Sequence, residues 1–476
     1  DTMLVARLRQ GGLHRGGAHL AVSSVRLYAS SAGAGEAPVE KRRPRLLVAG
    51  TGITGITVGL CLQAAGAQVD LVHGGGEKRR VGAGSKLYSS LGMDEWNSVV
   101  LNRSAMAVYR FLGLYDEIAA GPQSNELSKH VIQHGGSRNS AATMLSTVPL
   151  GTSGQAQAVN AYAVGSSWLR NLLTAAARRR ELTIPSEKTR LHKLNVNRPD
   201  GMCLATFRDG RAAKSYDAVI AADGSESPVR MLLFDQYKLL QPGYQAMHTV
   251  IRRPADVNGG VQLENWDPIG KKLVLTPLAN GELLVSLFSK AKYDPRHLRA
   301  GARTIGDMTK SLITGPVTGG VATVIDALKK LPQKQECVVE FPGTLEADKW
   351  YEHQTLLFGN TGATPEPFMG ARQSMEIEAA WYLAQAVSTA CGESTDRSDL
   401  HAAIAKFEKQ QKKRVWSALH FCRKANGEAT KRAETWPGWR KLMLRMRFSS
   451  RSVTNAYTRL ITGGAPAILS ACSGKD

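Results

Sequence analysis

The chain has 476 residues, of which 43% are hydrophobic and 21% charged, which is ordinary for a globular protein with room for two or more lobes. Its six cysteines form no C-x-x-C pair and no disulfide-like cluster, so we expect a reducing compartment and no metal site. No stretch approaches about 18 consecutive apolar residues, so we expect no membrane-spanning helix.

The net charge of +21 is concentrated at the two ends of the chain. Residues 1–45 carry a net charge of +5 and residues 406–476 carry +12, which leaves about +4 for everything between them. Strongly basic ends favour an anionic partner, such as RNA or a lipid surface. The alternative is that these charges only solvate exposed helix faces.

Residues 1–44 are predicted to be a basic arm of the mitochondrial-targeting type. Arginines at 7, 9, 15 and 26 are spaced among Ala, Ser, Gly and Leu, and Asp1 is the only acid before Glu36. An Arg- and Ser-rich, acid-poor segment without an apolar core is typical of a mitochondrial presequence. We therefore expect a mitochondrial protein, in the matrix or on the matrix side of the inner membrane. A disordered basic arm is the alternative.

The rest of the chain is organised around residues 45–73, which predict a β-α-β unit. An apolar run reaches Gly50, a helix-length segment follows, Gly66 ends it, and a second apolar run begins at Val69. Gly50, Gly52 and Gly55 have the G-x-G-x-x-G spacing of a dinucleotide-binding turn, in which a helix N-terminus holds phosphate. Glycines that serve packing alone are the alternative.

The acid that normally ends the second strand of such a unit is missing. That strand ends at His73, where Asp or Glu would accept hydrogen bonds from an adenosine ribose, and Asp70 lies inside the strand. The phosphate-binding turn is therefore predicted to be intact, whereas the ribose contact is not.

Further elements follow from periodicity and turn residues. The strand that ends at Asp223-Gly224 follows a predicted β meander, and Asn280-Gly281 is a strong hairpin signal between alternating strands. The remaining expectations are helices over 96–118, 166–178, 295–313, 321–330, 374–387 and 400–460, strand-like fragments near 131 and 148, a meander over 191–219 and a strand over 354–360.

These motifs together resemble the FAD-dependent aromatic hydroxylases, the flavoprotein monooxygenases of the p-hydroxybenzoate hydroxylase type, which include the ubiquinone-synthesis hydroxylases. The first motif is the glycine turn. The second is Asp223-Gly224, with Ser227 and Arg230 completing D-G-x-x-S-x-V-R. The third is the segment 359–379, against a family pattern close to G-D-A-A-H-x-x-x-P-x-x-G-x-G-x-N-x-x-x-E-D. The cofactor-binding positions that this resemblance implies are Gly50, Gly52, Gly55, Asp223, Gly224, Arg230, Gly359, Asn360, Pro367 and Gly370.

The departures from the family pattern fall on cofactor contacts. Asn360 replaces the Asp that in the family binds the pyrophosphate–ribityl region, Ala363 replaces a His, and Arg372 replaces a Gly where helix backbone approaches the flavin. Losing hydrogen bonds to buried polar or charged groups costs roughly 1–3 kcal/mol each. The flavin site is therefore predicted to be degraded, with FAD held weakly and NAD(P)H used only if the protein is active. We assign no catalytic residue.

The fold implied is α/β, with a Rossmann-like FAD-binding lobe, a second antiparallel β-sheet lobe and a C-terminal helical segment. The predicted parts are the basic arm 1–44, the FAD-binding lobe 45–240 with its return at 346–400, the substrate-type lobe 241–345 and the basic helical extension 401–476.

The favoured function is a structural or accessory subunit of a large mitochondrial assembly, such as the mitoribosome, a respiratory complex or ATP synthase. The alternative is an active FAD- and NAD(P)H-dependent monooxygenase that hydroxylates an aromatic substrate, such as a quinone precursor.

Overall fold

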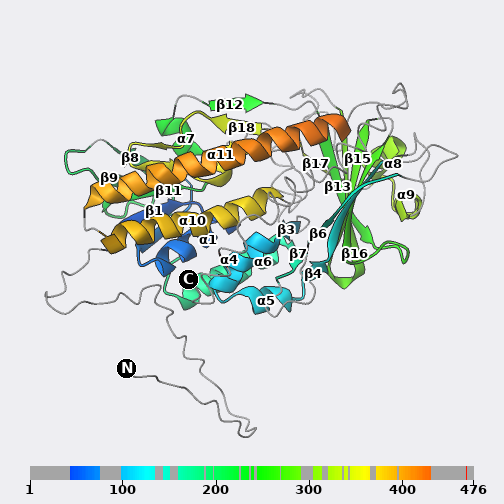
Figure 1. Ribbon diagram of the computed structural model, residues 1–476, viewed down its shortest axis with the longest axis horizontal. Helices are drawn as coiled ribbons and strands as arrows, with labels where there is room; N and C mark the ends of the chain where they lie inside the picture. Colours follow the sequence, from blue (N-terminus) through cyan, green and yellow to red (C-terminus); the bar gives the residue numbers. More distant parts are fainter. Residues whose placement is uncertain are drawn as a thin grey trace, which may run out of the picture. The chain divides into compact units, whose positions relative to one another are not determined.

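The structure is a computed structural model, and it contains both a parallel and a largely antiparallel sheet (Figure 1). The residues that it describes are 43–74, 98–134, 143–150, 159–186, 189–196, 198–224, 227–234, 237–240, 244–267, 270–290, 304–312, 320–334, 337–340, 344–364, 371–393, 396–429 and 468. Residues 1–42 of the predicted targeting arm lie outside these residues.

A five-stranded sheet carries the glycine turn. Its strand order is β19-β20-β11-β1-β2, and all neighbours except the edge pair β19–β20 run parallel. The strands are β1 (Arg45–Ala49), β2 (Gln68–Val72), β11 (Ala218–Ala221), β19 (Tyr351–Glu352) and β20 (Thr355–Leu357). The side chains of 46–49 are fully buried, because a central parallel strand is covered on both faces.

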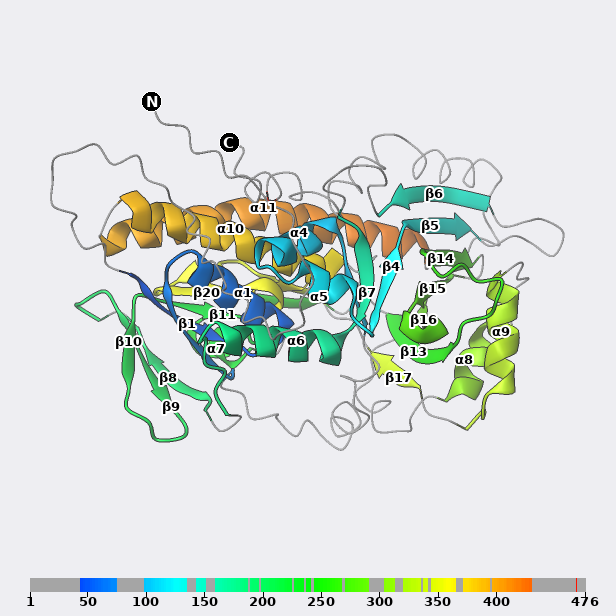
Figure 2. The same cartoon turned by 90° about the horizontal axis from the view of Figure 1, so that it is seen from below.

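Helices from distant parts of the sequence pack beside this sheet. Helix α1 (Ile53–Ala64) contacts α10 (Ala371–Glu393) and α6 (Ser166–Arg179), and α10 also contacts α11 (Arg397–Ala429) and α4 (Arg103–Phe111). Figure 2 shows α10 and α11 side by side along much of their length. Helix α1 is buried almost all round, which explains why its apolar residues lack a one-sided pattern. Two shorter helices are α5 (Tyr115–Ala119) and α7 (Pro228–Leu233).

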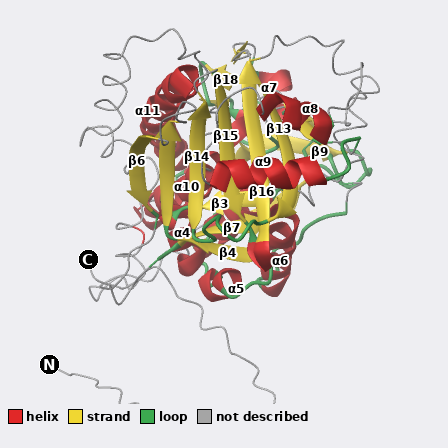
Figure 3. Cartoon of the chain, turned by 90° about the vertical axis from the view of Figure 1, so that its right-hand side faces the viewer, coloured by secondary structure: helices red, strands yellow, loops and turns green. Residues whose placement is uncertain are grey.

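The second sheet has seven strands in the order β17-β13-β16-β15-β14-β5-β6. These are β5 (Lys129–His134), β6 (Thr143–Pro149), β13 (Tyr244–Arg252), β14 (Val261–Asp267), β15 (Lys271–Pro277), β16 (Glu282–Lys290) and β17 (Val338–Glu340). Helices α8 (Ile305–Leu312) and α9 (Gly320–Lys330) cover one face, and Figure 3 shows α9 crossing it. The turn between β15 and β16 includes Asn280 and Gly281, both at positive φ, as the Asn-Gly signal predicted.

Three small sheets complete the described fold. They are β8 (Leu191–Asn195) with β9 (Cys203–Phe207) and β10 (Lys214–Tyr216); β12 (Tyr237–Leu240) with β18 (Thr344–Ala347) and β21 (Ala363–Thr364); and β3 (Ser98–Leu101) with β4 (Ser124–Leu127) and β7 (Ala161–Gly165). A buried apolar cluster joins the β3-β7-β4 sheet to the seven-stranded sheet through Val100, Ala163 and Trp266.

The predicted fold class is confirmed, with differences in detail. Ser98–Leu101 form a strand, although helical spacing was expected from residue 96, because strand pairing with β7 overrides local propensity. The seven-stranded sheet takes β5 and β6 from 129–149, which lie far before the segment 241–345. The parallel pairing of β5 with β14 is a long-range contact that no local pattern specifies. The division into parts by residue number stays a prediction.

No helix in the described part of the chain is both long and apolar enough to cross a membrane.

Candidate functional site

A cavity of about 470 Å³ opens over the carboxyl ends of the parallel strands. In an α/β sheet of this kind, ligands bind in the crevice outside those strand ends. Its wall is drawn from six separate segments of the chain. The lining residues are Gly50, Thr51, Gly52, Ile53, Thr54, His73, Gly74, Arg190, Ala222, Asp223, Gly224, Pro228, Phe358, Asn360, Gln373 and Glu376.

The glycine turn has the geometry that its spacing predicted. Gly50 has φ +138°, and a Cβ there would lie 2.2 Å from the carbonyl oxygen of Ala222. A Cβ at Gly55 would lie 2.1 Å from the carbonyl oxygen of Gly50, so helix and strand meet closely. Gly52, the N-cap of α1, has nothing within 4 Å of the position where a Cβ would be. Open space beside a helix N-terminus suits a phosphate group.

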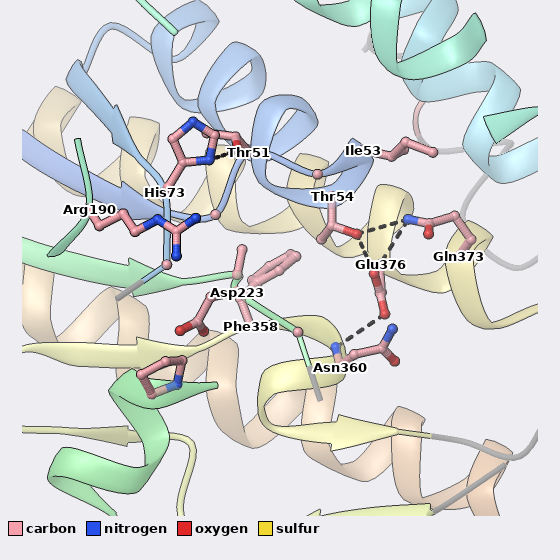
Figure 4. Close-up of a pocket in the computed structure, with 16 residues that line it drawn as sticks. Thr51, Ile53, Thr54, His73, Arg190, Asp223, Phe358, Asn360, Gln373 and Glu376 are labelled. Carbon is pink, nitrogen blue, oxygen red and sulfur yellow. Dashed lines mark hydrogen bonds between the residues drawn. The ribbon is translucent and has the colours of Figure 1, made fainter. Parts of the chain in front are cut away.

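One side of the cavity carries His73, Thr51 and Arg190 (Figure 4). Nδ1 of His73 lies 2.7 Å from Oγ1 of Thr51, and the backbone of His73 forms a parallel bridge with Arg190. This is the end of β2, where a dinucleotide site normally offers an acid to a ribose. Here the His73 imidazole and the Arg190 guanidinium line that side of the cavity.

Asp223 lines the cavity just after the end of β11 (Figure 4). Burial raises the pKa of its carboxyl from 3.8 to about 6, against the opposing effect of hydrogen bonds from neighbours that include Ser227, Val229 N and Thr361. Gly224 follows, and its N–H donates to Oγ1 of Thr361 at 3.0 Å. The Asp-Gly motif therefore joins the cavity to the turn that follows β20.

Glu376 lies on the opposite side of the cavity from His73 and is only 6% exposed (Figure 4). Its carboxylate accepts hydrogen bonds from the Thr54 hydroxyl, from Asn360 N–H at 3.1 Å and from Nε2 of Gln373 at 3.4 Å. Burial raises the pKa of the Glu376 carboxyl, while these donors and the Arg372 guanidinium oppose that shift. A carboxyl group that accepts three hydrogen bonds thus lies beside the first turn of α1.

Arg372 and Asn360, two departures from the family pattern, contact each other. Nε of Arg372 donates to Oδ1 of Asn360 at 2.8 Å. Arg372 is half-buried in the first turn of α10, and Asn360 lies in the short 3-10 turn Gly359–Thr361. The amide oxygen that replaces the family carboxylate is therefore already engaged by a cation of the same chain.

The remaining predicted site residues that the structure describes, Arg230 and Gly359, are not among those that line the cavity. Arg230 is 3% exposed and donates from Nη1 to the carbonyl oxygen of Thr361 at 2.8 Å, so it braces the turn and does not line the cavity. Gly359 has φ +61°, and a Cβ there would lie 2.9 Å from Cδ of Glu376. Pro367 and Gly370 lie outside the described residues.

Sequence reasoning missed Thr54, Arg190, Gln373 and Glu376 as lining residues. One usable signal pointed to Glu376, because this acid follows Arg372 by one helical turn and so lies on the same face of the helix. Arg190 had none, because its place at the cavity depends on the long-range bridge between its backbone and that of His73.

A second buried polar cluster lies on the seven-stranded sheet, away from the cavity. Nδ1 of His130 lies 2.8 Å from Oε1 of Gln262, and Nε2 lies 3.7 Å from the carboxylate of Glu264. Glu264 also accepts from Trp266 Nε1 at 2.7 Å and lies 3.8 Å from Nζ of Lys272. Burial lowers the pKa of His130 and the positive charge of Lys272 lowers it further, whereas Glu264 and Gln262 act to raise it. Within the described residues, no group of three or more His, Cys, Asp or Glu side chains is placed to hold a metal ion.

The cavity has one feature that favours the diphosphate of FAD and one that opposes it. The glycine turn has space for a phosphate beside Gly52, as the resemblance implies. However, the donors next to that space on Thr54 and Asn360 already bind the Glu376 carboxylate. A diphosphate on this turn would meet a second anion, and that arrangement does not fit the group.

Comparisons with known proteins agree with the fold and the glycine turn. Residues 44–251 match the family described as an FAD binding domain. The chain is 23% identical over 367 residues to the aurachin C monooxygenase/isomerase of Stigmatella aurantiaca, covering 76% of this chain and 84% of that protein. Among solved structures it resembles Klebsiella pneumoniae HpxO complexed with FAD and uric acid, with a TM-score of 0.64, 16% identity, and coverage of 90% and 97%. It also resembles PqsL, a probable FAD-dependent monooxygenase from Pseudomonas aeruginosa, with a TM-score of 0.64, 16% identity, and coverage of 82% and 98%.

Proposed function

Because the chain is a relative of the FAD-dependent aromatic monooxygenases, with their FAD binding domain and fold, we propose that it is a catalytically impaired member kept as an accessory subunit of a large mitochondrial assembly. The observation that carries the impairment is the position of Glu376. Its carboxylate takes the Thr54 hydroxyl and the Asn360 N–H, two donors beside the glycine turn.

The expected effect on the cofactor is large. Two unit negative charges about 5 Å apart repel by roughly 3 kcal/mol at an effective dielectric constant of about 20. That energy corresponds to roughly a 100-fold loss of affinity. The Arg372–Asn360 hydrogen bond adds to the loss, since the cofactor has to compete with a partner already in place. An enzyme of this class depends on a firmly held flavin, so weak binding supports the accessory role.

The outer face of α11 supports binding to an anionic surface in the assembly. Lys406, Lys409, Lys413 and Lys424 are exposed and recur at helical spacing, and Trp416 between them is 41% exposed. Other basic groups of the helix bind the protein itself: Arg414 pairs with Glu378, and Arg423 pairs with Glu346 at 2.7 Å. An exposed tryptophan among cations is suited to RNA or to a lipid headgroup region.

The proposed location follows from the composition of the ends of the chain. The Arg-rich, acid-poor arm favours import into mitochondria. Mitochondrial assemblies offer both kinds of anionic surface, RNA in the mitoribosome and lipid or protein around a respiratory complex or ATP synthase. The net charge of +12 over residues 406–476 is large enough for binding that depends strongly on salt.

The second candidate function is an active monooxygenase, and the preserved glycine turn favours it. Bound FAD, reduced by NAD(P)H, would supply the oxygen chemistry, and the protein would position and shield it. In that case Gly50, Gly52 and Gly224 would form the nucleotide cradle, and an aromatic substrate such as a quinone precursor would be hydroxylated.

A visible absorbance spectrum of the purified protein separates the two candidates. The impaired subunit is expected to purify colourless and to acquire a flavin spectrum only at high added FAD. A yellow protein with one flavin per chain that NAD(P)H bleaches would instead establish the monooxygenase.

Co-sedimentation tests the accessory role itself. Reversing the charge of Lys406, Lys409, Lys413 and Lys424 to Glu is expected to move the protein from the heavy fractions of a mitochondrial lysate to the light ones. The matched control reverses four other exposed lysines, at 193, 310, 330 and 334, and is expected to stay in the heavy fractions. If both variants and the wild-type protein sediment as free protein, the chain is not an assembly subunit.

A further inference from the structure

The side chain of Glu376 fills a place that the surrounding backbone is shaped to receive. Gly359 adopts φ +61°, and a side chain there would collide with the Glu376 carboxyl group, whose Cδ lies 2.9 Å from the position of a Cβ. Thr54, Asn360 and Gln373 supply the hydrogen bonds, from α1, from the turn after β20 and from α10 itself. Three elements therefore converge on one carboxylate.

This carboxylate lies next to the N-terminus of helix α1, and a helix N-terminus attracts anions. Thr54 is in the first turn of α1, whose N-terminal N–H groups carry partial positive charge. Helix α1 has no acidic residue of its own in its first turn. Glu376 therefore supplies, from a distant part of the chain, the negative charge that the helix end favours.

We propose that Glu376 is an internal anion in place of a ligand diphosphate and that it determines which nucleotides the cavity accepts. The cavity is then selective for an uncharged adenosine moiety and discriminates against FAD and other diphosphates. This inference rests on the proposed function, since it names the residue that weakens the cofactor. It also assigns a class of ligand to the cavity, namely compounds with an uncharged adenosine moiety.

The side of the cavity away from Glu376 is consistent with such a ligand. His73, Thr51 and Arg190 line it together, and none of them is an acid. An adenosine bound there would have His73 and Arg190 beside it in place of the usual ribose-binding acid, and it would place no charge beside Glu376. A ligand with a diphosphate has to displace the carboxylate from Thr54 and Asn360 or share the space with a like charge.

Isothermal titration of the full-length protein with adenosine, ADP and FAD tests the proposal. In the wild-type protein, ADP is expected to bind no more tightly than adenosine. In Glu376→Gln, ADP and FAD are expected to bind about 10- to 100-fold more tightly than in the wild-type protein, because one negative charge is removed. Adenosine affinity is expected to change less than about threefold. The matched control, Glu352→Gln, makes the same substitution on a carboxylate away from the cavity and is expected to leave all three affinities unchanged.

Each outcome decides the proposal. Unchanged FAD affinity in Glu376→Gln, or an equal gain for adenosine, would show that Glu376 does not select against diphosphates. If Glu376→Gln does not fold, the order of adenosine and ADP affinities in the wild-type protein decides, and tighter ADP binding refutes the proposal. Tight FAD binding by the wild-type protein overturns the impaired function as well. Weak FAD binding that Glu376→Gln does not improve overturns only the role of Glu376.

Discussion

Nε of Arg372 lies 2.8 Å from Oδ1 of Asn360 and donates a hydrogen bond to it. These two residues are separate departures from the family pattern, one on the helix and one on the strand-end turn, yet they form a single contact. A guanidinium that binds the amide oxygen keeps it from a ligand, so the two changes are expected to act together.

A double-mutant cycle checks this coupling. Asn360→Asp alone is expected to form a half-exposed ion pair with Arg372, raising stability by at most about 1 kcal/mol and leaving FAD affinity unchanged. Arg372→Ala with Asn360→Asp is expected to raise FAD affinity by more than the product of the single changes, since the new carboxylate is no longer occupied by Arg372 and can accept hydrogen bonds from the ribityl hydroxyl groups. Fluorescence titration with FAD measures the affinities, and strictly additive effects would show that the pair is not coupled.

Alanine substitutions at two glycines of the turn separate packing from binding. Gly55→Ala is expected to destabilise the fold by about 3 kcal/mol or more, because its Cβ would lie 2.1 Å from the Gly50 carbonyl oxygen. Gly52→Ala, where the Cβ meets open space, is expected to cost at most about 1 kcal/mol and to reduce nucleotide affinity instead. Urea unfolding gives the stabilities, and equal losses at both positions would contradict the assigned roles.

Asp223 is expected to lower the stability of the protein at neutral pH. Its pKa is raised to about 6 in the folded state from 3.8, so the folded protein binds more protons across that interval and its stability falls as pH rises through it. Asp223→Asn removes this dependence and is expected to be about 1–3 kcal/mol more stable than wild type above about pH 7. The difference is expected to vanish below about pH 4, and unfolding curves at both pH values measure it.

His130 is expected to lower the stability of the protein in acid. Burial lowers its pKa below 6.5, so the unfolded chain binds more protons, and stability present above about pH 6.5 is lost as pH falls towards the folded pKa. Thermal unfolding of the wild-type protein between about pH 7 and pH 5 is expected to show a steeper loss than His130→Gln. The comparison with the variant is needed because Asp223 titrates in the opposite sense. Parallel pH profiles would mean that His130 does not contribute.

The sequence by itself determined the features that depend on neighbouring residues. The β-α-β unit could be predicted from residues 45–73, because an apolar run, a glycine turn and a helix stop follow one another within it. The hairpin at Asn280-Gly281 was equally local, since it depends on two residues that tolerate positive φ. The order of three spaced motifs then indicated the fold of the whole chain.

Only the tertiary structure determines which distant side chains lie next to those motifs. Thr54 and Glu376 are 322 positions apart and share a hydrogen bond, and Arg190 lies at the cavity beside His73, with which its backbone forms a bridge. His130 meets Glu264 because β5 and β14 pair in parallel. Contacts of this kind depend on chain packing over long separations, and no local pattern records which distant side chain will complete a site. For that reason the phosphate-binding turn was visible in the sequence, whereas the carboxylate beside it was not.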